Sequence, residues 1–240
     1  MIFLRKACSN LCFGQLYRKD KYKNLKMKHF IFTVILLMAF CSTGTLFGQG
    51  VYDEAVYRGP VALSYPFKTY KGTYYAFDKF FEKGDVEYNR KWYRNVELNL
   101  DACRDELCLS MGGRSIIVLS KELVGRFVFS GRNFICLGDS VEGLAPGYYQ
   151  VLYDGEDKVY KKIRKKYDKT DGITQEFYPI VKYYLVQGNK ARQIKGTGIF
   201  GKVYKPLKKE IRRLVSSIDR TGISEESLYV AIMEMVAKKK

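Results

Sequence analysis

The chain contains a single histidine, His29, among its 240 residues. His29 lies within residues 27–48, which we predict to be a signal peptide. The exported part would therefore contain no histidine. Ser-His-Asp and Cys-His catalysis both depend on a histidine base, and histidine is also the commonest metal ligand. The scarcity of histidine therefore disfavours these enzyme classes and leaves aspartate and glutamate chemistry as the catalytic alternative.

Cysteine is also scarce beyond residue 48, where only Cys103, Cys108 and Cys136 remain. Three thiols without histidine lack the four ligands of a usual zinc site, so we expect neither a metal nor a cofactor. In an oxidising compartment Cys103 and Cys108 could form a disulfide, because a four-residue hairpin loop between them would set them opposite each other. A two-residue loop at Arg104 and Asp105 would not. The alternative is three buried thiols that pack as small apolar groups.

The apolar run at residues 30–40 is shorter than the roughly 20 residues that a membrane-spanning helix needs. It follows a short basic start and precedes a small, polar segment, which is the pattern of a signal peptide. We predict a signal peptide over residues 27–48, cleaved near Gly48 or Gln49, with retention as an N-terminal membrane anchor as the alternative. Residues 1–26 are too few to form a core. We predict that they are a disordered leader, or that translation starts at Met27.

Acidic residues are in the minority. Beyond residue 48 the chain has 34 Lys and Arg against 24 Asp and Glu, which gives a net charge of +10. Outside the cytoplasm a basic surface meets few nucleic acids. The expected partners are an anionic lipid headgroup at a membrane surface, an acidic polysaccharide or an acidic protein. The alternative is a solvated basic face without a partner.

Residues 49–204 are predicted to form a β-rich domain. Val96, Leu98 and Leu100 alternate with polar residues, which is the two-residue period of a half-buried strand. The dipeptides Asn89-Arg90 and Asp154-Gly155 separate strand-like segments and predict tight hairpin turns. We expect strands over residues 74–81, 85–88, 91–93, 96–100, 106–111, 115–120, 126–129, 133–137, 148–153, 158–167, 177–187 and 190–195.

The predicted strand at residues 158–167 carries positive charge on both faces. Lys161 and Lys165 fall on one face, and Lys162, Arg164 and Lys166 fall on the other. Charge on both faces is typical of an edge strand, where lysine also guards against pairing with other molecules. We therefore predict that this strand forms an edge of the sheet. The same residues form one half of a candidate basic binding surface.

Residues 205–240 change to the period of a helix and are predicted to form a helical hairpin packed on the β-rich domain. The inward positions of the first helix are Leu207, Ile211, Leu214, Val215 and Ile218. Its outward positions are Lys208, Lys209, Arg212 and Arg213. Ser224 is placed to cap a second helix. The apolar face of that helix comprises Leu228, Ala231, Ile232 and Met235. The predicted fold class is α+β: a mostly antiparallel meander or sandwich-like β body, followed by this helical hairpin.

Residues 196–203, GTGIFGKV, match a dinucleotide-binding fingerprint. They also nearly match a phosphate-binding loop, except that Val203 stands where a magnesium-binding hydroxyl is needed. The context fits neither motif, because the preceding segment is polar and no alternating pattern of strands and helices surrounds it. We interpret the glycines as a flexible connection between the sheet and the helices.

The order of these parts resembles a group of uncharacterised, exported, β-rich proteins of Gram-negative bacteria that end in a helical hairpin. The resemblance is carried by F-x-K-G-x-V at residues 81–86, V-x-x-D-G at residues 151–155 and YYLV at residues 183–186, together with the lysine-rich last helix. It covers about residues 75–237. It implies export and this architecture, and it brings no activity or catalytic residue with it.

We predict a non-enzymatic cell-envelope protein, periplasmic or associated with the outer membrane, that binds a protein or an anionic envelope component. The candidate basic binding surface comprises Lys161, Lys162, Arg164, Lys165, Lys166, Lys208, Lys209, Arg212 and Arg213. One alternative is a hydrolase of envelope polymers that uses two carboxylates about 5 to 10 Å apart. Its candidate acids are Asp101, Asp105, Glu106 and Asp139. The other alternative is an N-terminally anchored envelope protein.

Overall fold

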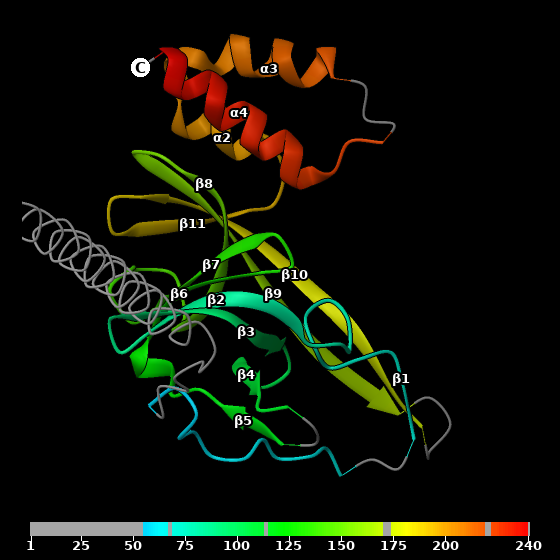
Figure 1. Cartoon of the computed structure of the whole chain (residues 1–240). Helices are drawn as coiled ribbons and strands as arrows, with labels where there is room; N and C mark the ends of the chain where they lie inside the picture. The colour runs from blue at the N-terminus through cyan, green and yellow to red at the C-terminus, as the bar shows by residue number, and fades with distance from the viewer. Residues whose placement is uncertain (1–54, 67–68, 113–114, 170–173, 219–221, 240) are drawn as a thin grey trace, which may run out of the picture. The chain divides into compact units, whose positions relative to one another are not determined.

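The computed structural model describes residues 55–66, 69–112, 115–169, 174–218 and 222–239 (Figure 1). All of them belong to one compact unit, Asp53–Lys240. The predicted leader at residues 1–26 and the predicted signal peptide at residues 27–48 lie outside the described residues. Among the helices that are described, none combines the length and the apolar character needed to cross a membrane.

Eleven strands of the described chain form a single sheet (Figure 1). The strands are β1 (Tyr70–Lys71), β2 (Glu82–Tyr88), β3 (Lys91–Asp101), β4 (Glu106–Ser110), β5 (Ile116–Val118), β6 (Val124–Phe129), β7 (Arg132–Leu137), β8 (Gly147–Asp154), β9 (Asp157–Lys169), β10 (Gln175–Gln187) and β11 (Lys190–Ile194). A short 3₁₀ helix, η1 (Lys121–Leu123), precedes β6. The strand order is β1-β10-β9-β8-β7-β6-β2-β3-β4-β5, and β11 pairs with β10.

Most neighbouring strands in this sheet are also neighbours in sequence. The exceptions in the described chain are β2, which pairs with β6, and β1, which adds two residues in parallel to the start of β10. The β1–β10 pairing is parallel, and the other pairings between these strands, β2–β6 included, are antiparallel. Three helices follow the sheet (Figure 1). A mostly antiparallel, strand-rich body followed by helices confirms the predicted α+β class.

The predicted turn at Asn89-Arg90 is confirmed. Both residues have positive φ, 50° and 64°, which is the backbone twist that a two-residue hairpin loop requires. The strand expected at residues 74–81 is wrong, because this segment is irregular and β2 begins only at Glu82. It is nevertheless tied to β3, since the Ala76 amide donates to the Leu100 carbonyl at 2.8 Å. The Asn99 side-chain amide also donates to the Phe80 carbonyl at 2.8 Å.

The prediction that residues 158–167 form an edge strand is also wrong. Strand β9 lies inside the sheet: it pairs with β10 over its whole length and with β8 over its first residues. After Lys161, where the pairing with β8 ends, the same edge of β9 is covered by the β3–β4 turn, residues 102–105. There the Lys165 amide donates to the Ala102 carbonyl at 3.0 Å. The positive charge that suggested an edge is instead balanced by partners from distant parts of the chain.

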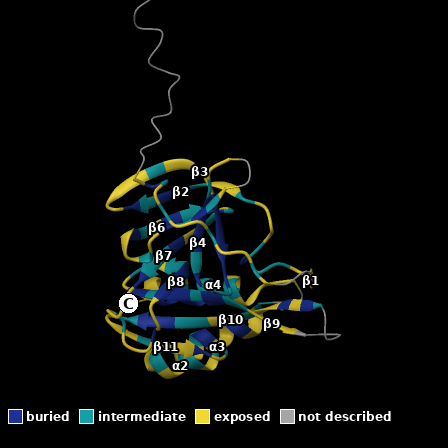
Figure 2. Cartoon of the chain, turned by 90° about the horizontal axis from the view of Figure 1, so that it is seen from below, coloured by how far each residue is buried: buried dark blue, intermediate teal, exposed yellow. Residues whose placement is uncertain are grey.

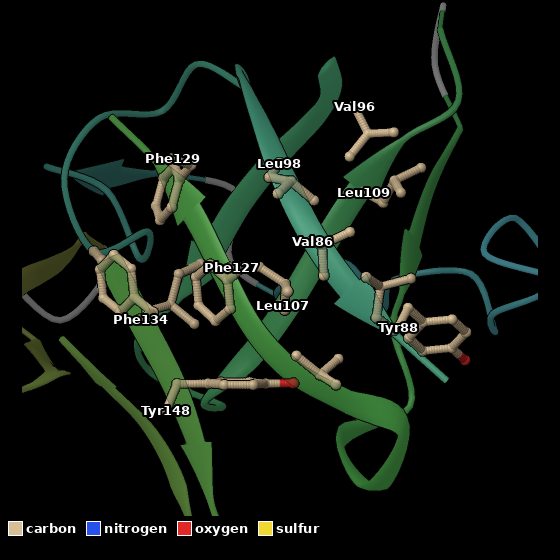
Figure 3. Packing of buried hydrophobic residues seen from close by; sticks show 14 of the residues in the cluster. Val86, Tyr88, Val96, Leu98, Leu107, Leu109, Phe127, Phe129, Phe134 and Tyr148 are labelled. Carbon is tan, nitrogen blue, oxygen red and sulfur yellow. The ribbon is translucent and has the colours of Figure 1, made fainter. Parts of the chain in front are cut away.

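The main core is formed by inward side chains of β2 to β9 (Figure 3). Phe127 is fully buried and stacks on Phe134, with ring centroids 4.7 Å apart and planes 1° apart. The Tyr148 ring meets Phe127 edge-on at 5.4 Å. Leu98 and Leu107 complete the centre and are fully buried. The predicted alternation is confirmed only in part: Val96, Leu98 and Leu100 are buried and Glu97 is exposed, but Asn99 and Asp101 are buried as well, so the end of β3 is covered on both faces.

The helical part starts earlier than the sequence suggested. Helix α2 (Gly198–Val203) is followed by η2 (Lys205–Leu207), α3 (Lys208–Ser217) and α4 (Glu225–Lys239). The expectation of a flexible connection at residues 196–203 is therefore wrong. Phe200 explains why: it is fully buried in a second core with Val159 and Leu185 of the sheet, so its burial favours an ordered helix despite the glycines.

The predicted second helix is confirmed, but its buried face is rotated. The Ser224 hydroxyl accepts a hydrogen bond from the Ser227 amide at 3.2 Å, as expected of a cap. The buried residues of α4 are Tyr229, Ile232, Met233 and Val236. Leu228, Ala231 and Met235, which were expected to lie inward, are only half-buried. The sheet and the neighbouring helices together contact more than one face of α4, so a single stripe does not predict its orientation.

Burial leads us to expect that the protein loses stability as the pH rises above 9. Burial raises the pKa of Cys108, Tyr149 and Tyr183 to about 12, above the ordinary values of 9.0 for cysteine and 10.0 for tyrosine. Between pH 9 and 12 the unfolded chain therefore releases protons that the folded chain retains. The free energy of unfolding then falls as the pH rises. Urea unfolding at a series of alkaline pH values measures this slope. Tyr183→Phe should make it shallower, and a flat profile would contradict the prediction.

Candidate anion-binding groove

A groove of about 450 Å³ lies between α2 and α3. Three cationic side chains line it: Lys202 from α2, and Lys208 and Arg212 from α3. The side chains of Thr197 and Ser216 add hydroxyl groups at its margin. We call this feature, with these five residues, the α2–α3 groove. Its polar groups are mainly donors, which suits an anionic ligand.

Packing underneath the groove fixes the two helices that form it. Ile211 and Val215 of α3 are buried in the second core and line the base of the groove. Gly201 of α2 allows the two helices to approach closely, because a Cβ atom at this position would lie only 3.3 Å from Cγ of Lys208. The spacing Lys208 to Arg212, four residues, places both cations on one side of α3. The cations Lys208 and Arg212 are therefore carried by a helix that its buried residues fix in position.

The cations of the α2–α3 groove have no acidic partner among the described residues. No ion pair or hydrogen bond engages the charged groups of Lys202, Lys208 or Arg212 there. Glu210, the only acid in residues 202–213, is 3.9 Å from Lys239 of α4. The same twelve residues contain six Lys and Arg. Their positive potential is therefore balanced by solvent ions, which an anionic ligand can displace.

The structure places the predicted α3 residues partly in this groove. Lys208 and Arg212 line it, whereas Lys209 and Arg213 are exposed and are not among its lining residues. The outer surface of the helices carries many exposed residues (Figure 2). The half of the candidate surface that lies on α3 is therefore accessible to a partner.

The half of the candidate surface that lies on β9 is mostly engaged inside the protein. Lys161 forms an ion pair with Glu226 of α4 at 2.5 Å. Arg164 donates to the Cys103 carbonyl at 2.9 Å, and Lys165 donates to the Thr73 carbonyl at 2.7 Å. Only Lys166 of this group is fully exposed. The prediction that β9 offers a free basic surface is therefore wrong.

Lys162 is the most strongly engaged residue of β9. Its ammonium group lies 2.7 Å from Asp105 and 2.9 Å from the Tyr148 carbonyl, and both charged side chains are more than 90% buried. Burial lowers the pKa of Lys162, while Asp105 acts in the opposite direction. Gly147 is required here, because a Cβ atom would lie 2.0 Å from the Asp105 carboxylate. This pair joins β9 to the β3–β4 turn and serves packing.

The proposed disulfide geometry is not the one that the chain adopts. The β3–β4 loop comprises residues 102–105, so Cys108 lies opposite Asn99 and Cys103 lies in the turn. Cys103, Cys108 and Cys136 are free thiols in the structure. Within the described ranges, no three His, Cys, Asp or Glu side chains are grouped in a way that could hold a metal ion.

Two of the acids considered for carboxylate chemistry have structural partners. Asp101 accepts hydrogen bonds from the Tyr65 hydroxyl at 2.8 Å and from the Cys103 amide at 2.9 Å, which fixes the β3–β4 turn. Asp105 is paired with Lys162. Glu106 is half-buried and Asp139 is exposed. None of the four lines the α2–α3 groove.

Sequence reasoning did not include Lys202 or Thr197 in the candidate surface. Both lie in the glycine-containing stretch that was interpreted as a connection. The signal was available in the spacing, because Lys202 precedes the basic residues of the following helix by only a few positions.

Comparisons of the chain with protein-family models, curated proteins and solved structures found no match.

Proposed function

We propose that the protein is a non-enzymatic, exported component of the cell envelope that binds an anionic envelope component in the α2–α3 groove. The observation that carries the proposal is the set of three cations, Lys202, Lys208 and Arg212, that converge on a hollow without a described carboxylate partner. Anionic headgroups and acidic glycans carry the complementary charge.

Vesicle binding tests the anionic part of the proposal. The full-length chain should bind vesicles that contain phosphatidylglycerol more tightly than vesicles of phosphatidylcholine alone. Each Lys or Arg near such a surface contributes about 1 kcal/mol. The variant with Lys208→Glu and Arg212→Glu should therefore bind roughly 30-fold more weakly, the equivalent of about 2 kcal/mol. The effect should fade as the salt concentration rises.

A matched variant separates the groove from general positive charge. Lys83→Glu with Lys182→Glu makes the same change in net charge at two exposed lysines of β2 and β10, neither of which belongs to the candidate surface. It should leave vesicle affinity within about threefold of the unmodified chain, since surface charges away from the contact contribute little. Equal losses in the two double variants, or no preference for anionic vesicles, would overturn the groove as the binding site.

Export is tested separately from binding. We expect protein recovered from its native envelope fraction to begin near Gln49 or Gly50 when its N-terminus is sequenced. Intact mass measured with and without reductant would show whether any pair of thiols becomes oxidised in that compartment. An N-terminus at Met1 or Met27 would overturn cleavage and favour the anchored alternative.

A further inference from the structure

A second hollow, on the outer face of the sheet, has a different chemistry from the α2–α3 groove. It has a volume of about 360 Å³ and extends from Trp92 of β3 to the β8–β9 hairpin. This volume is within the range of about 300–1,000 Å³ that is usual for small-molecule sites. It is lined by residues of β3 and β6 to β9, whereas the α2–α3 groove is formed by helices. An inference about it therefore goes beyond the proposed function. We call it the Trp92 hollow.

The Trp92 hollow has an apolar floor and an aromatic wall. Val128, Ile135 and Val151 of three adjacent strands are half-buried and form the floor. Trp92, 44% exposed, stands beside them. The guanidinium of Arg94, which also pairs with Asp85, lies over one face of the indole at 4.8 Å from its centroid. A flat indole next to aliphatic side chains is suited to the C–H face of a ring-shaped ligand.

Polar groups surround this floor. Arg126 and Asn133 are exposed, and their side chains form no hydrogen bond or ion pair with any described residue. Asp154 and Lys158 at the other side are paired with each other and half-exposed. Together these side chains offer both donors and acceptors. A ligand for the hollow must therefore combine an apolar face with hydroxyl or amide groups at its edges.

We propose that the Trp92 hollow binds a saccharide, with a pyranose ring stacked on Trp92 and its hydroxyl groups bonded to Asn133, Arg126 and the Asp154–Lys158 pair. A pyranose has an apolar C–H face and hydroxyl groups around its edge that donate and accept, which matches the floor and the surrounding groups. An acyl chain would leave these polar groups without partners. A simple anion would gain only Arg126, because Lys158 is already neutralised by Asp154.

Trp92 is the only tryptophan of the chain, so tryptophan fluorescence reports on this hollow alone. The full-length protein should be titrated with maltotriose, cellotriose and the trimer of N-acetylglucosamine. At least one should cause a saturable change in emission with a dissociation constant of about 1 mM or tighter. Asn133→Ala and Arg126→Ala retain the fluorophore, and each should weaken that binding about tenfold.

Calorimetry extends the test to variants without the fluorophore. Trp92→Ala should abolish measurable binding, whereas Tyr178→Ala, which removes an exposed aromatic residue from β10, should leave it unchanged. The proposal is overturned if none of the three sugars binds, or if binding is the same in Asn133→Ala, Arg126→Ala and the unmodified chain. A hydrophobic dye that changes the emission when no sugar does would also overturn it, and would define an apolar docking surface instead. None of these outcomes depends on vesicle binding by the helices.

Discussion

Lys162→Met is expected to lower the free energy of unfolding by about 3–5 kcal/mol, the usual cost of leaving one buried charge without its partner. The variant keeps the bulk of the side chain and removes its ammonium group. Asp105 would then be buried with only Lys121 at 3.4 Å and Arg164 at 3.8 Å, and both of these cations are more exposed than Lys162. Urea unfolding at neutral pH measures the loss.

Lys158→Met is the matched control for this prediction. Lys158 lies on the same strand and also forms an ion pair, but both partners are substantially exposed. Its replacement should cost about 1 kcal/mol or less. Asp105→Asn combined with Lys162→Met should recover part of the stability, because no buried charge is then left unpaired. Asparagine also tolerates the positive φ of 62° at position 105. Equal losses in the Lys162 and Lys158 variants would show that the buried pair is not important for stability.

Phe127→Ala is expected to destabilise the fold by about 3–5 kcal/mol, the range for removing a large aromatic side chain from a core. Phe127 is fully buried, and its removal would deprive both Phe134 and Tyr148 of their ring contacts. The cavity would lie at the centre of the strand core (Figure 3). Denaturant unfolding with an unchanged slope against urea concentration would report this loss directly.

Phe80→Ala provides the comparison. Phe80 is 64% exposed, so its loss should change stability by about 0.5 kcal/mol or less. Phe127→Leu should retain much of the buried surface and cost less than alanine. If Phe127→Ala and Phe80→Ala lowered the free energy of unfolding by similarly small amounts, the stacked rings would not form the core.

The parts of the fold that depend on local sequence could be predicted. Alternation of apolar residues identified β3, and the residues at the Asn89-Arg90 turn have the backbone that such a turn needs. Helical spacing identified α3 and α4, because each buries apolar residues from one stretch of chain. These signals were sufficient for the α+β class. They did not determine which strands would become neighbours.

The predictions that failed depend on residues distant in sequence. The charges of β9 looked like those of an edge because their partners, Asp105 and Glu226, are separated from them by 57 and 65 residues. Because of the same pairings, the β9 half of the candidate basic surface is mostly unavailable to a partner. Helix α2 was missed because the glycines dominate its local sequence, while its order depends on the burial of Phe200 among residues of the sheet. On α3 the predicted positions Lys208 and Arg212 do line the groove, whereas Lys209 and Arg213 do not.

The order of strands in the sheet also has a consequence for how the chain assembles. The segments β2 to β5 and β6 to β11 each consist of strands that pair with their neighbours in sequence, so each can form through short loops. The two meanders are joined by the β2–β6 pairing, which must close a long loop. During synthesis β2 emerges well before β6, and until then its outer edge has no partner in the sheet. Until β6 is made, the outer edge of the first meander is therefore open to pairing with other molecules, which is a route to aggregation.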